Sequence, residues 1–224
     1  TDRAIDYLQT RRGDRPFLLV ASYDEPHGPC TCPPRYVRRF EDFEFDIGPA
    51  VEDDLADKPQ HLRQWADACG EQSRQLRRPL FFGCNSYVDA EIGRVIDAAL
   101  DRGDRNTWII YTSDHGDLLG AHQITGKGPA MFEEITRVPL LIRPPGGMAG
   151  RVDRDITSHL DLLPTMLELA GAATTPIMAG RSLAPRLAAD GSDADDTGDR
   201  TAMIEFSRFA MNHDGWGGYV PIRA

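Results

Sequence analysis

Short apolar runs alternate along the chain with longer segments in which apolar residues recur at helical spacing. Five runs predict strands, namely residues 17–21, 107–112, 138–143, 202–206 and, near the last residue, 219–222. The first run carries no charged residue, which is typical of a strand that is buried on both faces of a sheet.

Helical periodicity predicts the other elements. Residues 1–12 form an amphipathic pattern, and residues 61–102 are mainly helical, with Pro79 separating two helices. Asp161 is a suitable N-cap for a helix over residues 162–170. Because strands and helices alternate, the chain predicts an α/β fold with helices on both faces of a sheet.

Composition narrows the class of protein. The chain has 224 residues, 41% hydrophobic and 27% charged, which suits one globular domain or part of a larger one. A formal net charge of -10 argues against a nucleic-acid binder but leaves an anionic substrate possible, since a metal or a lysine can dominate a pocket. No apolar run is long enough to predict a membrane span.

The termini and the cysteines add two expectations. The chain begins at Thr1 rather than Met, so we expect a cut amino terminus and predict no compartment. The cysteines lack zinc-site spacing, and we expect free or buried thiols. They are Cys30, Cys32, Cys69 and Cys84.

Asp114 and His115 directly follow the predicted strand over residues 107–112. If the backbone turns there, a carboxylate and an imidazole can face one divalent cation, and we expect Gly116 to supply that turn. The alternative is an Asx-type turn with a surface histidine.

Three further side chains lie on loops at predicted strand ends. Lys127 stands between two glycines and can approach an anion as a compact charge, or it is an ordinary exposed lysine. His122, in the same loop, can donate to an ester oxygen or is simply solvated. His27, on a proline-rich loop, is a candidate general acid or anion donor, with a structural role as the alternative.

A glycine-rich loop near the end of the chain contains His213 and Trp216. An indole can stack on a sugar ring, so this loop can line a carbohydrate pocket. The alternative is an ordinary turn between strands.

Several of these segments together resemble the sulfatase family of the alkaline-phosphatase-like superfamily. The resemblance rests on TSDHGDLLGAH at residues 112–122, GKG at 126–128 and EEITRVPLLIRPPG at 133–146. DEPHGP at residues 24–29 matches a second block in the expected order, and the helix at residues 161–171 matches a third.

The resemblance implies a role for each matching residue. Asp114 and His115 would be metal ligands, Lys127 would contact the sulfate, and His27 would contact the sulfate or the leaving oxygen. His122 would line the substrate pocket. His213 and Trp216 lie in the less distinctive end of the chain, and their predicted role in substrate binding rests on their side-chain chemistry alone. The implied cofactors are a divalent cation, Ca or Mg, and formylglycine.

The chain departs from the family pattern in one respect. Sulfatases carry an earlier block with paired acidic ligands and a Cys-x-Pro-x-Arg or Ser-x-Pro-x-Arg motif, whose first residue becomes the formylglycine nucleophile. Residues 32–35 (CPPR) are one residue too short for this motif and follow the His27 loop, so we reject them. We expect the true block in a segment before Thr1, and we expect the isolated chain to have little turnover.

These inferences define the predicted protein. Its fold is a three-layer α/β sandwich with a mostly parallel or mixed sheet, alkaline-phosphatase-like. Residues 1–188 are predicted to be the carboxyl-terminal part of the sulfatase catalytic domain, and residues 189–224 an acidic loop and the start of the carboxyl-terminal region. Its function is hydrolysis of a small-molecule or carbohydrate sulfate ester, with no nucleic-acid or membrane partner. The alternatives are a phosphonate monoester or phosphodiester hydrolase and a non-catalytic binder of anionic glycans.

Overall fold

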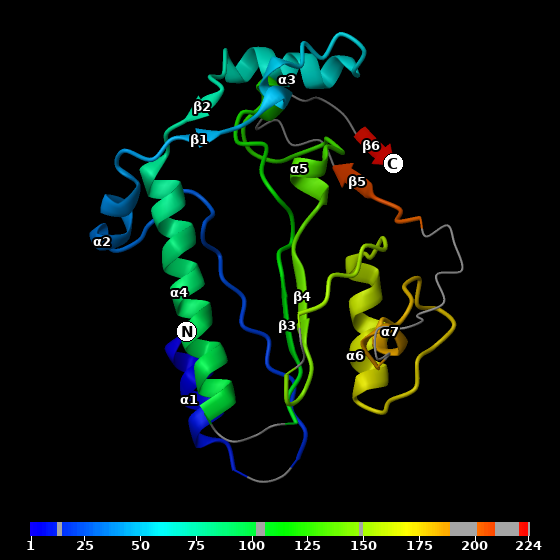
Figure 1. The fold of residues 1–224 in the computed structure, drawn as a ribbon. Coiled ribbons are helices and arrows are strands. Elements are labelled where there is room, and N and C mark those ends of the chain that lie inside the picture. Colours follow the sequence, from blue (N-terminus) through cyan, green and yellow to red (C-terminus); the bar gives the residue numbers. More distant parts are fainter. Residues whose placement is uncertain (13–14, 102–105, 148–149, 189–200, 209–219, 224) are drawn as a thin grey trace. The chain divides into compact units, whose positions relative to one another are not determined.

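Two compact units divide the chain, Thr1–Gly146 and Gly147–Ala224. The structure, a computed structural model, describes residues 1–12, 15–101, 106–147, 150–188, 201–208 and 220–223 (Figure 1). The domain boundary predicted at residue 188 adjoins residues outside this description and stays a prediction.

Two helices form one side of the first unit. Helix α1 (Asp2–Thr10) packs against the long helix α4 (Pro79–Asp101), as Figure 1 shows in blue and green. An exposed ion pair of 2.9 Å joins Arg94 of α4 to Asp2 of α1, which contributes little to stability. The predicted helices are confirmed here, and α4 begins at Pro79, where proline fits a first helical turn.

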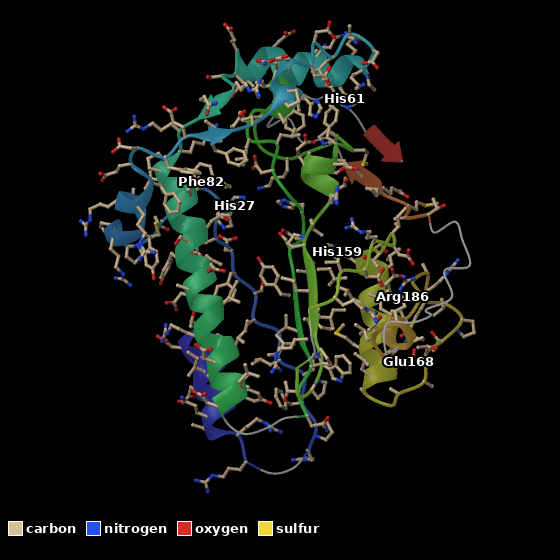
Figure 2. All side chains as sticks on the ribbon, in the orientation of Figure 1. His27, His61, Phe82, His159, Glu168 and Arg186 are labelled. Atoms are coloured by element: carbon tan, nitrogen blue, oxygen red, sulfur yellow. The ribbon has the colours of Figure 1, made fainter. Side chains whose placement is uncertain are left out.

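Two short helical elements pack against the amino-terminal half of α4. Helix α2 (Pro34–Val37) and the 3-10 helix η1 (Arg38–Phe40) pack against it. Phe82 of α4, labelled in Figure 2, has its ring centroid 6.0 Å from Phe40 and 5.0 Å from Phe43. These aromatic contacts fix the segment that follows the His27 loop.

Strands β3 (Ile109–Thr112) and β4 (Leu140–Arg143) pair in antiparallel register, with Ile110 opposite Ile142. Both were predicted, each two residues longer at its start. Because β3 ends at Thr112, the chain passes from a hydrogen-bonded strand directly into Ser113 and Asp114.

The prediction of a buried strand at residues 17–21 is wrong for the described structure. The segment belongs to no described strand pair, and Leu18 and Val20 are 73% and 77% exposed. Apolar composition shows that a segment favours burial, but it does not supply the neighbouring strand that would bury it.

The described strands also differ from a mostly parallel sheet. They form three separate two-stranded antiparallel pairs, β1–β2, β3–β4 and β5–β6. Their remaining bounds are Phe45–Asp46 for β1, Gln75–Leu76 for β2, Glu205–Arg208 for β5 and Val220–Arg223 for β6. The predicted layered sandwich is therefore not visible in the described strands.

The main core of the first unit lies between helix α3 (Gln60–Cys69) and the long loop after β3. This loop includes the 3-10 helix η3 (Ala121–Gln123) and leads to helix α5 (Glu133–Thr136), while the 3-10 helix η2 (Pro49–Glu52) packs on η3. The core residues are Leu55, Leu62, Leu118, Ala121, Ile124, Ala130 and Ile135. The loop that carries Lys127 is thus packed into the core rather than extended into solvent.

The second unit contains the 3-10 helix η4 (His159–Asp161) and helices α6 (Leu162–Leu169) and α7 (Ala184–Ala188). Asp161 does not cap α6 with its side chain, contrary to the prediction. It is the N3 partner of Ser158 in a capping box, accepting from Ser158 N at 3.0 Å, and it also accepts from Arg181 N at 2.7 Å. Because the 3-10 helix η4 precedes α6, the side-chain cap is at Ser158, three residues before the predicted position Asp161.

A charged cluster in the second unit joins α7 to the segment that contains Asp153 and Asp155. Arg186 of α7 donates from Nε to Asp153 Oδ2 at 2.8 Å and from Nη2 to Asp153 Oδ1 at 3.0 Å, and also pairs with Asp155. Its side chain is only 14% exposed, so the bidentate pair is shielded from water. Among the described helices of the chain, none is long and apolar enough to cross a membrane.

Candidate metal and anion site

Asp114 and His115 turn toward each other immediately after β3. The distance from Asp114 Oδ2 to His115 Nε2 is 3.3 Å, and their side chains are 82% and 38% exposed. The backbone N–H of His115 also donates to Asp114 Oδ1 at 2.9 Å. This contact reaches only the next residue, whereas an Asx-type turn uses the N–H two residues on, so the contact does not form the turn of the alternative interpretation.

Gly116 holds this turn by close approach rather than by an unusual backbone conformation. Its φ is not in the left-handed region, so the glycine is needed at this turn for lack of a side chain rather than for its φ. A Cβ at this position would lie 1.9 Å from the Glu134 carbonyl oxygen, and Gly116 N donates to Ile135 O at 2.8 Å. Only glycine allows α5 to press against the turn so closely.

The Gly116 carbonyl group indicates which nitrogen of the neutral His115 ring carries the hydrogen. Nδ1 lies 2.8 Å from the Gly116 carbonyl oxygen, and a carbonyl can only accept, so Nδ1 carries the hydrogen. In the neutral ring Nε2 is then an acceptor facing a second acceptor, Asp114 Oδ2. A divalent cation can accept an electron pair from each of these two atoms.

The donor set fits part of a divalent-cation site. A carboxylate oxygen and an imidazole nitrogen are both ligands that divalent cations take in proteins, so Asp114 and His115 would hold such an ion from one side. A carbonyl that fixes the ring through the other nitrogen is a common outer support of a histidine ligand. No group of three or more such ligands occurs within the described residues, so these two side chains supply only part of a coordination sphere.

The carboxyl group of Asp114 is held ionised. Partial burial raises its pKa, but the hydrogen bond from the His115 N–H and the nearby His115 ring lower it, and the pKa lies below its usual value. An ionised carboxylate is the form that binds a cation.

Lys127 lies exposed on the loop between η3 and α5, between two glycines. Gly126 has a φ of +83°, a backbone conformation that residues with a side chain rarely adopt. No hydrogen bond or ion pair engages the Lys127 ammonium in the described part of the chain, so its charge is available to an anion.

His27 is exposed on the loop of residues 24–29. Its backbone N–H donates to Asp24 O at 3.0 Å, and its ring Nδ1 lies 3.0 Å from Gly28 O. As at His115, a backbone carbonyl contacts Nδ1, and within the described residues no hydrogen bond or ion pair engages Nε2 of His27. Figure 2 labels this histidine on the segment that runs beside α4.

His122 has a different environment from the other candidates. Its Nδ1 lies 2.7 Å from Asp53 Oδ2, its Nε2 lies 3.4 Å from Glu134 Oε1, and its ring stacks on Phe132 with centroids 3.7 Å apart. The side chain is only 14% exposed. Both nitrogens face protein carboxylates, so neither is open to a substrate in this arrangement, and the predicted substrate role stays a prediction.

The described contacts bring some candidates together and leave others apart. Asp114 and His115 face each other, whereas no hydrogen bond, ion pair or ring contact among the described residues links them to His27 or Lys127. His213 and Trp216 lie outside the described residues. The four cysteines are free, as predicted, and Cys84 is fully buried.

Sequence reasoning missed the partners of the candidate residues. Asp53, Glu134 and Phe132 enclose His122, and His61 and Trp65 of α3 contact the Lys127 loop. The contact between Asp53 and His122 spans 69 residues, so no local pattern signals it. The four-residue spacing of His61 and Trp65 was a usable signal, because residues four apart lie on successive turns of one helix face.

The comparisons with known proteins identify the family. The sequence matches the family described as Sulfatase over residues 1–172 of 224. Uncharacterized sulfatase YidJ of Escherichia coli (strain K12) is 45% identical over 227 residues, covering 100% of this chain and 44% of that protein. The chain belongs to the sulfatase family, and it spans less than half the length of the curated relatives it matches.

Solved structures show the fold. A protein solved with its substrate D-glucosamine-2-N,6-O-disulfate superposes with a TM-score of 0.75 at 23% identity, covering 95% of this chain and 56% of that chain. The phosphonate monoester hydrolase of Silicibacter pomeroyi is 31% identical with a TM-score of 0.54, covering 65% of this chain and 30% of that chain. The fold of this chain is therefore of the alkaline-phosphatase-like type of its sulfatase neighbours.

Proposed function

We propose that the protein hydrolyses a sulfate ester with the help of a divalent cation. The observation that carries this proposal is the facing pair of acceptors, Asp114 Oδ2 and His115 Nε2, held 3.3 Å apart on the turn after β3 in a sulfatase-family chain. The proposed cation is Ca²⁺ or Mg²⁺, which Asp114 and His115 would help to hold.

Each remaining candidate has an electrostatic or acid role in the proposal. A sulfate ester is already anionic, so a nucleophile must approach negative charge, and a cation with Lys127 reduces the repulsion. His27 donates a proton to the departing alcohol oxygen. Formylglycine supplies the nucleophile when present, and the 224 residues contain no motif for it.

The architecture of the whole domain is part of the proposal. We expect the strands described here to belong to a mostly parallel or mixed sheet within a three-layer α/β sandwich, and residues 1–188 to lie in its catalytic domain. The support is the TM-score of 0.75 with a longer solved protein. His213 and Trp216 are proposed to line a carbohydrate subsite, on the chemistry of their side chains.

Hydrolysis of a phosphonate monoester or phosphodiester is the second candidate. One observation favours it: a phosphonate monoester hydrolase of related structure is 31% identical to this chain. The metal and lysine would act on a phosphoryl oxygen in the same way, so the assay must distinguish the two esters.

The test is turnover of p-nitrophenyl sulfate with added Ca²⁺ by the whole gene product, co-expressed with a formylglycine-generating enzyme. We expect Asp114→Asn and Lys127→Ala to remove turnover, and the matched changes Asp57→Asn and Lys58→Ala to retain it. The 224-residue chain assayed alone should show little turnover.

The other outcomes assign the alternatives. Turnover of p-nitrophenyl phosphonate or phosphodiester without sulfate turnover would move the protein to the second candidate. Binding of sulfated glycans with no turnover of any ester would indicate a non-catalytic binder.

A further inference from the structure

One face of α3 touches the Lys127 loop at three points. His61 donates from Nε2 to the carbonyl of Pro129 at 2.9 Å, and Cys69 Sγ lies 3.5 Å from both the hydroxyl and the backbone nitrogen of Thr125. Between them, Trp65 lies against Gly128, where a Cβ would come within 2.8 Å of the indole ring. Residues 61, 65 and 69 follow one another at four-residue steps, so they share a helix face.

These contacts bracket Lys127 on both sides in the sequence. Thr125 precedes it by two residues, and Gly128 and Pro129 follow it. Ile124 and Ala130, at the two ends of the segment, are 0% and 3% exposed in the same core. The backbone under Lys127 is therefore fixed at five of its neighbours, while the lysine side chain itself stays exposed.

We infer that α3 is a positioning platform that holds the Lys127 ammonium at a fixed place for an anion, with Trp65 as its central residue. The inference rests on the proposed contact between Lys127 and sulfate, and it adds three residues that touch the loop but not the substrate. A charge on a fixed backbone loses less freedom when it binds than a charge on a mobile loop, so its affinity is higher.

The sequence provides a direct probe of Lys127. Of the 25 basic residues only Lys58 and Lys127 are lysines. Reductive methylation with carbon-13 formaldehyde keeps the positive charge and gives NMR signals from these two lysines and the amino terminus. Lys58 is paired with Asp57 at 2.9 Å and serves as the internal reference.

The first experiment titrates the labelled 224-residue chain with sodium sulfate at constant Ca²⁺, with sodium chloride as the ionic-strength control. We expect sulfate to shift the Lys127 signal in a saturable way and to leave the Lys58 signal unchanged. The apparent sulfate Kd from this shift is then compared among variants.

The variants test the contact between Trp65 and Gly128 from both sides. Gly128→Ala forces the loop away from the indole, and Trp65→Leu removes the ring that supports it. We expect each to raise the apparent sulfate Kd about 10-fold. The double variant should return to within about threefold of wild type, because leucine leaves room for the added methyl group. Gly93→Ala on α4, whose Cβ would meet nothing within 4 Å, is the matched control.

Amide hydrogen exchange of Gly126 and Leu118, which are hydrogen-bonded within the loop, gives a second readout that needs no anion. Faster exchange in the single variants, slowed again in the double variant, would support the platform. If sulfate shifts no signal while exchange behaves in this way, the proposed contact between Lys127 and sulfate is wrong, but α3 still holds the loop. Cys69→Ala supplies the same exchange test if a Trp65 variant does not fold. Unchanged Kd and exchange in the folded single variants, or a double variant worse than both, would overturn the platform.

Discussion

Two pairs of histidine and aspartate lie in the first unit, and their environments are opposite. His115 and Asp114 are 38% and 82% exposed, with their free acceptor atoms 3.3 Å apart. His122 and Asp53 are 14% and 25% exposed and 2.7 Å apart, and the second nitrogen of His122 faces Glu134. The first pair is open to solvent and can hold a cation, whereas the second is closed within the protein.

The difference shows that residue type alone does not assign a role to a histidine. Both rings lie within seven residues of each other in one loop, so the local sequence treats them alike. What separates them is the chain that packs over each ring: a carbonyl on one side of His115, and two carboxylates and Phe132 around His122. The open acceptor atom of His115 is suited to binding a ligand, whereas the paired ring of His122 is suited to stabilising the fold.

The largest expected effect separates the two aspartates. Asp114→Asn removes the anionic half of the open pair, and we expect turnover of the sulfate ester to fall about 100-fold or more while the melting temperature stays within error. Asp53→Asn should do the reverse, lowering the melting temperature with a smaller loss of turnover. Steady-state kinetics and thermal unfolding of both variants measure this. Equal losses of turnover would remove the distinction.

The histidines should differ in stability. His122→Ala leaves Asp53 and Glu134 without their partner, and we expect the free energy of unfolding to fall by about 1–3 kcal/mol. His115→Ala, at the open site, should change it by less than about 0.5 kcal/mol. Urea unfolding followed by circular dichroism measures both. A destabilised His115→Ala variant would count against an open site.

The ring stack at the closed site has a smaller expected effect. Phe132→Leu keeps an apolar side chain but removes the ring parallel to His122, and we expect a loss of about 0.5–1.5 kcal/mol of unfolding free energy. Phe43→Leu, in the separate aromatic group near α4, is the comparison for general loss of an aromatic ring. If His122→Ala and Phe132→Leu act on one unit, their effects will not add.

Lowering the pH should reduce the contribution of the Asp53–His122 pair to the free energy of unfolding. Burial raises the pKa of Asp53, but the Leu55 N–H and His122 outweigh it, and the pKa lies below its usual value. A lowered folded-state pKa stabilises the fold above the unfolded value of about 3.9, and this stabilisation is lost as the pH falls through the folded value. The stability difference between wild type and Asp53→Asn should therefore shrink below about pH 4. Urea unfolding across a pH series measures it, and a constant difference would contradict the expectation.

Much of the local structure followed from the sequence. The helices beginning at Asp2 and Pro79 and the strands ending at Thr112 and Arg143 lie where the apolar pattern predicted them. The strand at residues 17–21 and the side-chain cap by Asp161 were predicted and not found. Both depend on a second segment, a neighbouring strand in one case and the turn before α6 in the other, and a local pattern does not contain that information.

By itself the sequence determined the chemistry available: a carboxylate and an imidazole after a strand, a lysine between glycines, and the family these residues resemble. The tertiary structure decided how each group is used. It turned His115 toward Asp114 through the Gly116 carbonyl, closed His122 between carboxylates from distant segments, and set the Lys127 loop on the face of α3. The physical reason is that hydrogen-bond partners and burial come from packing between distant segments, which residue order alone does not specify.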